Sequence, residues 1–175
     1  MAVPLIALAV AGCAQVVRPH VALPVLQLAP STLGYELAEQ QRLVFHFGGE
    51  RREMVALLEV DSTDVRLAVE VLGQTGVRLH WDGETLEERR ASWLPPQVKS
   101  ARVLDDIQFV LWPLDAIRSV LPTDWHVESG KNERRLVRKG AIWLAARYDG
   151  ATVTLENVAD GYRLEVQSVA AAAAR

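Results

Sequence analysis

The residues suited to acid–base, nucleophilic or metal chemistry are few in this sequence, and they are scattered. The histidines are His20, His46, His80 and His126. No two of them have the four-residue spacing that places a pair of ligands on one face of a helix. The sequence also lacks the Gly-x-Ser-x-Gly turn of a hydrolase and a glycine-rich phosphate loop. The pattern predicts a protein that is not an enzyme and that binds neither a metal nor a cofactor.

The neighbouring carboxylates Asp105 and Asp106 have two interpretations. They are an acid–base pair, or they lie in the first turn of a helix, where carboxylates meet free N–H groups and the positive end of the helix dipole. Adjacent residues on a helix point in different directions, so helix capping is the simpler interpretation.

Cys13 is the only cysteine, and it ends an apolar run that begins at Met1 and carries no charged side chain. Residues 1–12 are too few to span a bilayer and fit a signal peptide. The run "LAVAGC" resembles the bacterial lipobox, which implies cleavage before Cys13 and its acylation. Ala14, rather than an aspartate, follows the cysteine, which implies the periplasmic face of the outer membrane. The alternative is a buried structural cysteine in an N-terminal strand.

Residues 13–32 form the predicted lipidated N-terminus and a proline-rich tether. Pro19, Pro24 and Pro30 recur along it, and proline fixes φ and removes a backbone donor, so an extended chain is expected. The many valines and leucines of this stretch are unusual for a free linker. Part of it is therefore expected to lie against the domain or the bilayer.

From residue 33 onward the hydrophobic residues recur at every second position, as half-buried antiparallel strands require. Between about residue 103 and residue 122 the period changes to that of two short helices, the second beginning at Pro113 and ending at Pro122. Five more alternating segments follow, separated by Gly, Asp or Asn turns. Residues 132–139, "NERRLVRK", are interpreted as a solvated strand, with contact to anionic head groups as the alternative.

About ten short strands with one helical insertion predict a mainly β (α+β) fold. The expected architecture is a curved antiparallel sheet that forms an unclosed half barrel and is covered by two or three short helices. Residues 33–169 form this single domain, and residues 170–175 are an expected disordered tail. The net charge of −3 gives no basic patch, so no nucleic-acid partner is expected. The five tryptophans either pack in the core or line a hollow.

The lipobox, the strands and the segment "WPLDAIRSVLP" together resemble the LolA/LolB-type lipoprotein carriers. Pro113, Leu114, Ile117 and Arg118 match the rhythm of the helix that follows the first half of that unclosed barrel. Over roughly residues 13–169 the chain is more closely similar to a family of bacterial lipoproteins catalogued as domain of unknown function 3261. Members of that family are often encoded in aryl polyene clusters beside a LolA-like protein. The exposed leucine loop of LolB is not evident, although Leu72 lies at an expected turn.

The resemblance and the apolar strand faces lead to two hypotheses. The first is an outer-membrane lipoprotein whose half barrel binds acyl or polyene-like chains, with the membrane and a LolA-like periplasmic protein as partners. It would aid the transport or placement of a lipid product or a lipoprotein. The second is a lipid-anchored structural or adaptor protein that docks a protein partner and has a solidly packed barrel. For the first hypothesis the expected lipid-binding residues are Leu43, Phe45, Leu58, Leu67, Val69, Leu79, Trp81, Leu114 and Ile117.

Overall fold

The computed structural model describes residues 21–92 and 99–169. The first half of the chain forms a short 3₁₀ helix and five strands, whose successive segments are joined by tight turns. These elements are η1 (Pro30–Leu33), β1 (Leu37–Phe47), β2 (Glu50–Val60), β3 (Val65–Val71), β4 (Gln74–Trp81) and β5 (Leu86–Arg90). The strands follow the period-two apolar pattern of the sequence.

The second half begins with two helices and continues with five strands. These elements are α1 (Ser100–Leu111), α2 (Leu114–Val120), β6 (Trp125–Ser129), β7 (Glu133–Arg138), β8 (Ala141–Asp149), β9 (Thr152–Asn157) and β10 (Tyr162–Val169). Pro113 precedes α2 with a φ of −57°, which suits the start of a helix. The predicted pair of short helices is therefore confirmed.

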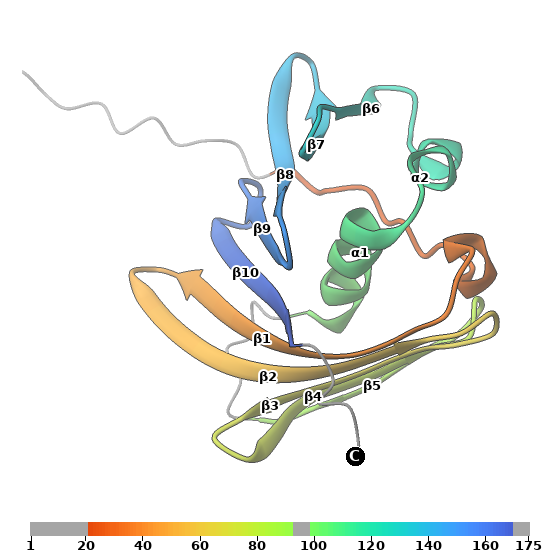
Figure 1. Cartoon of the computed structure of the whole chain (residues 1–175). Coiled ribbons are helices and arrows are strands. Elements are labelled where there is room, and N and C mark those ends of the chain that lie inside the picture. The colour runs from red at the N-terminus through yellow and green to blue at the C-terminus, as the bar shows by residue number, and fades with distance from the viewer. Residues whose placement is uncertain (1–20, 93–98, 170–175) are drawn as a thin grey trace, which may run out of the picture.

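All ten strands belong to one antiparallel sheet in the order β5-β4-β3-β2-β1-β10-β9-β8-β7-β6. The two halves of the chain meet where β1 pairs with β10, and the register places Leu43 opposite Val166 and Phe45 opposite Leu164. The sheet curves strongly without its edges joining, so the predicted unclosed half barrel is confirmed (Figure 1). The two edge strands are β5 and β6.

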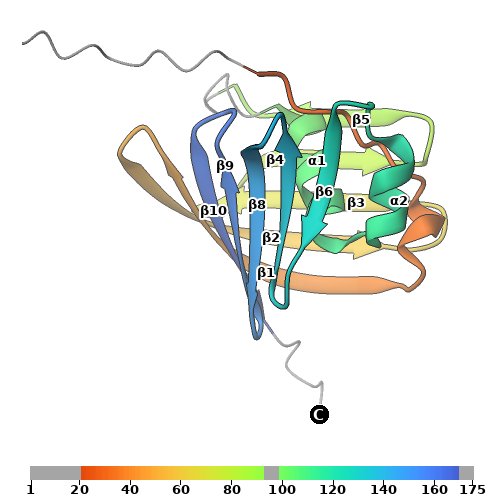
Figure 2. The same cartoon turned by 90° about the horizontal axis from the view of Figure 1, so that it is seen from above.

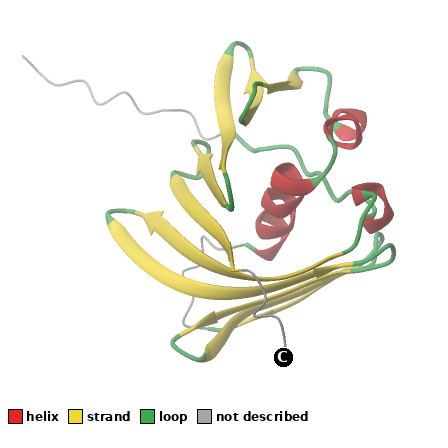
Figure 3. Cartoon of the chain, in the orientation of Figure 1, coloured by secondary structure: helices red, strands yellow, loops and turns green. Residues whose placement is uncertain are grey.

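Helices gather on the concave side of this sheet (Figure 3). Helix α1 lies in the hollow, with β4 and β5 as its nearest strands, and α2 lies next to β6 (Figure 2). The helices thus fill the side on which the two sheet edges fail to meet. Edge strand β5 carries four charged residues in the sequence "LEERR", which discourages pairing with another chain.

Two local interpretations of the sequence are wrong. Asp105 and Asp106 lie in the middle of α1, whose first turn holds no acidic residue, so they do not cap the helix. Strand β7 is not simply solvated, because a shift in its register with β8 leaves both Leu136 and Val137 buried. Within the described residues, neither helix has the length and apolar character that a membrane-spanning helix needs.

Candidate functional site

The concave face of β2, β3 and β4 is a continuous apolar surface. Leu58 pairs with Leu67, which in turn pairs with Leu79, so three leucines form one row across three strands. A parallel row is formed by Ala56, Val69 and Val77. Trp81 extends the surface at the end of β4 and is 3% exposed. Alternation along each strand places all of these side chains on the same side.

Eight of the nine residues expected to bind lipid lie in one apolar cluster or pack against it. They are Leu43, Leu58, Leu67, Val69, Leu79 and Trp81 of the sheet, with Leu114 and Ile117 of α2. Phe45 lies apart from this cluster, and its ring stacks on Phe47 at 6.3 Å and contacts the ring of Tyr162 at 5.3 Å. The sequence therefore identified the concave face, with one residue nearer its rim.

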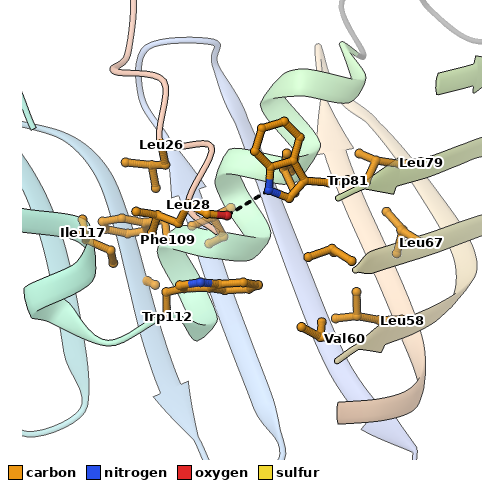
Figure 4. Packing of buried hydrophobic residues seen from close by; sticks show 14 of the residues in the cluster. Leu26, Leu28, Leu58, Val60, Leu67, Leu79, Trp81, Phe109, Trp112 and Ile117 are labelled. Atoms are coloured by element: carbon orange, nitrogen blue, oxygen red, sulfur yellow. Dashed lines mark hydrogen bonds between the residues drawn. The ribbon is translucent and has the colours of Figure 1, made fainter. Parts of the chain in front are cut away.

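The concave face is occupied by the chain itself. Leu104 and Phe109 of α1, and Trp112 directly after it, are completely buried. The N-terminal segment, residues 21–33, contributes Leu26, Leu28 and Leu33 to the same cluster. Figure 4 shows Leu28 between Phe109 and Trp81, facing the strands that carry Leu67 and Leu79. The expected ligand surface is thus the inner surface of a closed core in this structure.

The N-terminal segment was expected to be a tether, and its described part lies against the domain. Pro24, Leu26 and Leu28 are buried, whereas Val25 and Gln27 between them are exposed. This is the period-two pattern of a strand, but the segment belongs to no strand of the sheet. The alternation of "PVLQL" is the sequence signal that predicts burial, and the predicted domain boundary at residue 33 divides a packed unit.

Side chains of α1 and β4 satisfy the backbone of the N-terminal segment. The N–H of Leu26 donates to Asp105 Oδ1 at 2.8 Å. The N–H of Leu28 donates to Gln108 Oε1, and the carbonyl of Leu28 accepts from Gln108 Nε2, both at 2.8 Å. The same carbonyl accepts from Trp81 Nε1 at 2.8 Å (Figure 4). Sequence reasoning missed Gln108 and the role of Asp105 because their partners lie some 80 residues away in the chain.

A charged cluster attaches α1 to the neighbouring strand β10. Arg102 Nε donates to Asp106 Oδ1 at 3.0 Å, and the hydroxyl of Tyr162 donates to the other oxygen of Asp106. Burial raises the pKa of Asp106 to about 6, although Arg102 acts in the opposite direction. Burial also raises the pKa of Asp105. Both carboxylates are used in packing and bonding, so the structure gives no support to an acid–base pair.

The C-terminal end of α1 is held by a second set of contacts. Arg134 Nη1 donates to the carbonyl of Phe109 at 2.7 Å and to that of Trp112 at 2.8 Å. A cation at this end of a helix also opposes the negative end of the helix dipole. The hydroxyl of Tyr148 donates to the carbonyl of Val110 at 2.8 Å, and burial raises the pKa of Tyr148 to about 12.

Two open pockets lie outside the helix-covered interior, although the second is lined in part by the core residue Leu58. One of about 460 Å³ lies between the β1–β2 and β9–β10 turns and is lined by Phe47, Tyr162 and Arg163, among others, but by none of the nine expected lipid-binding residues. The other, of about 200 Å³, includes Leu57 and Leu58. Neither pocket is the hollow beneath the helices that the carrier hypothesis expects.

The remaining candidate residues of the sequence form no further site among the described residues. Cys13 and Trp93 lie outside the described residues. His80 Nε2 lies 2.5 Å from Asp64 Oδ1, on a partly exposed strand. In residues 21–92 and 99–169, no group of three or more His, Cys, Asp or Glu is placed to hold a metal ion.

The chain is similar to a known family of proteins. A protein-family model described as "Protein of unknown function (DUF3261)" matches residues 38–170. No curated protein matches the chain.

Proposed function

The chain belongs to the DUF3261 family of proteins of unknown function, and from that premise we propose that it is a non-enzymatic, lipid-anchored carrier at the periplasmic face of the outer membrane. Its half barrel binds an acyl or polyene-like chain between the concave face and α1. The bound chain is part of a lipid product or a lipoprotein that is being placed at that membrane. A LolA-like periplasmic protein is the proposed partner in this transfer.

The observation that supports this proposal is a difference in bonding between the sheet and its cover, which consists of α1 and the N-terminal segment. Backbone hydrogen bonds join the ten strands along their length, whereas α1 and the N-terminal segment meet the concave face through apolar packing and side-chain bonds. The cover can move without breaking the strand ladder. Its movement exposes the row of Leu58, Leu67 and Leu79. Burial of a hydrocarbon there is worth about 25 cal/mol per Å² of apolar surface.

The second candidate is a lipid-anchored adaptor that docks a protein partner and holds no lipid. The observation that favours it is the filling of the concave face by Leu28, Phe109 and Trp112. An adaptor needs no internal space, because its partner binds the outside of the domain. Convex residues such as Leu57, which is 50% exposed, are available for that contact.

Analysis of bound lipid and titration with a fluorescent fatty acid distinguish the two candidate functions. Protein purified from membranes is extracted for mass spectrometry, and the delipidated protein is titrated with the fluorescent fatty acid cis-parinaric acid. The carrier yields a stoichiometric acyl or polyene compound and binds the probe. Val69→Phe is expected to weaken binding at least tenfold, because the larger ring fills space on the concave face. Val55→Phe, on the convex face, is the matched control.

Thermal unfolding of both variants shows whether each is folded. Probe binding that is equally affected by the two substitutions contradicts binding at the concave face. The absence of bound lipid and of probe binding in the wild-type protein contradicts the carrier and supports the adaptor.

A further inference from the structure

The N-terminal segment occupies the core in the manner of a bound peptide. Its residues 24–30 run beside α1 and bend at Gln27, whose φ is 39°, and in two views they pass along the side where the sheet edges do not meet (Figures 1 and 2). None of the ten described strands pairs with them. Their buried side chains enter the apolar cluster, and side chains of the domain hydrogen-bond their backbone.

Gln108 is the residue that recognises this segment most specifically. It is completely buried, and both ends of its side-chain amide bond a single residue, Leu28. Its oxygen accepts the N–H of Leu28, and its nitrogen donates to the carbonyl of the same residue. Trp81 donates to that carbonyl as well, and Asp105 accepts the N–H of Leu26. The domain therefore presents two acceptors and two donors for backbone amide groups within an apolar surface.

This arrangement limits what can replace the segment. A plain hydrocarbon would pack against the leucines and Phe109, but it would take away the partners of Gln108 and of the indole N–H of Trp81. Asp105 would keep its ion pair with Arg102 and lose only the backbone N–H groups of the segment. Buried polar groups that lose their partners are strongly unfavourable. The N–H and the carbonyl of Leu28 lie on either side of one Cα and belong to two peptide groups, so one amide alone cannot replace both. An acyl chain whose amide N–H is followed one carbon later by a second carbonyl oxygen restores the bonds of Gln108 and Trp81, while its hydrocarbon fills the space of the leucines.

The segment is also easier to displace than α1. Among the described residues it joins the sheet at one end only, through η1 and Gly34, whose φ of 86° suits glycine. Helix α1 is attached at several points, because Arg134 and Tyr148 bond its C-terminal carbonyls and Tyr162 bonds Asp106. Release of the segment opens the space between α1 and β4 and leaves these attachments in place.

We infer that residues 24–30 are an internal ligand of the domain, and that the external ligand that displaces them is an acyl chain joined to its carrier group through an amide. This inference rests on the proposed carrier function and specifies both its site and its ligand class. Gln108 hydrogen-bonds the amide, and the leucines of the concave face pack against the hydrocarbon.

Two ligands of similar length test the ligand class. Palmitic acid and N-myristoylglycine each carry one carboxylate, but only the second has an amide within the chain. The wild-type protein is expected to bind N-myristoylglycine about three- to tenfold more tightly, as one or two hydrogen bonds allow. Gln108→Met is expected to remove this preference without weakening palmitic acid. Equal affinities in the wild-type protein overturn the amide assignment.

Hydrogen exchange tests the displacement. The amide hydrogens of Leu26 and Leu28 are expected to be protected in the free protein and to lose protection when N-myristoylglycine binds. Leu28→Ser, which weakens the seating of the segment, is expected to raise the affinity for the ligand several-fold. Val25→Ser is the matched control, because Val25 is 59% exposed on the same segment.

The outcomes separate this inference from the function on which it rests. Ligand binding with unchanged protection at Leu26 and Leu28 overturns the internal ligand and leaves the carrier function standing. Failure of the wild-type protein and of Leu28→Ser to bind either acyl compound, with both proteins folded, overturns the inference and the carrier function together.

Discussion

At the scale of single residues, Leu72 has an unusual backbone for its type. It is the first residue of the two-residue turn between β3 and β4, and its φ is 50°, followed by a φ of 76° at Gly73. Turns of this kind favour Asn, Asp or Gly, because a β-carbon is crowded at positive φ. The side chain of Leu72 is 99% exposed and gains nothing from packing. The strain at this position is therefore not compensated by local contacts.

Leu72→Asn is expected to raise the free energy of unfolding by about 0.5–1 kcal/mol, because asparagine adopts positive φ more readily. Urea unfolding followed by fluorescence measures the change. Leu72→Ala is the control, since alanine removes the exposed leucine but lacks the polar side chain that lets asparagine hydrogen-bond locally at positive φ. An equal gain from both variants would show that exposure, and not backbone conformation, sets the stability at this turn.

At the scale of elements, the most informative contact is the attachment of α1 to β10 through Asp106. Because the pKa of Asp106 is raised to about 6 in the folded protein, the folded state holds a proton there between about pH 4 and pH 6 that the unfolded state has released. This group therefore favours folding most at the acidic end of that range. Its contribution declines as the pH rises through 6.

Asp106→Asn removes this proton uptake and leaves an amide that accepts from Tyr162. The stability of the variant relative to the wild-type protein is expected to shift in favour of the variant by roughly 1–3 kcal/mol between pH 4 and pH 7. Denaturant unfolding at several pH values measures the difference. Asp115→Asn, an exposed substitution on α2, serves as the control for a lost surface carboxylate. A constant difference between wild type and Asp106→Asn would contradict a raised pKa at this site.

The same elements show what local sequence reasoning can recover. Alternation along β2, β3 and β4 identified Leu58, Leu67 and Leu79 as one face, because strand periodicity is a local property. The role of Asp105 was not recoverable in this way. Its partner Leu26 is 79 positions distant in the chain. The residues on either side of Asp105 do not reveal whether its carboxylate is buried in the middle of a helix or lies in the first turn. Long-range polar partners must be seen in three dimensions.

At the scale of the whole molecule, the unclosed sheet was predictable and its filled interior was not. Ten alternating segments with one helical insertion lead to a curved sheet because the strands are too many for a flat one. The sequence pattern for an apolar concave face is the same whether a ligand or the chain itself occupies that face. Whether the interior is filled depends on the side chains of Trp112, Phe109 and Leu28, and only the three-dimensional structure shows that they lie together there.

Attachment to the membrane is also a property of the whole chain. If acylation at Cys13 anchors the protein, as proposed, Cys13→Ala is expected to move it from the membrane fraction to the soluble fraction. Fractionation followed by immunoblotting measures the distribution. Cys13→Ala protein that stays with the membranes would contradict the lipid anchor and direct attention to the exposed apolar side chains of the domain.

The binding of residues 24–30 beside α1 limits the distance between the domain and a lipid anchor at Cys13. With the carbonyl of Pro24 held near Arg102, the chain from position 13 to position 24 allows a reach of roughly 40 Å at full extension. Once residues 24–30 leave their place, the free chain extends to η1 at Pro30 and the reach rises to roughly 60 Å. A ligand that displaces residues 24–30 would therefore lengthen the connection between the domain and its membrane anchor. A domain with bound ligand would then reach farther into the space between the two membranes than a domain without ligand.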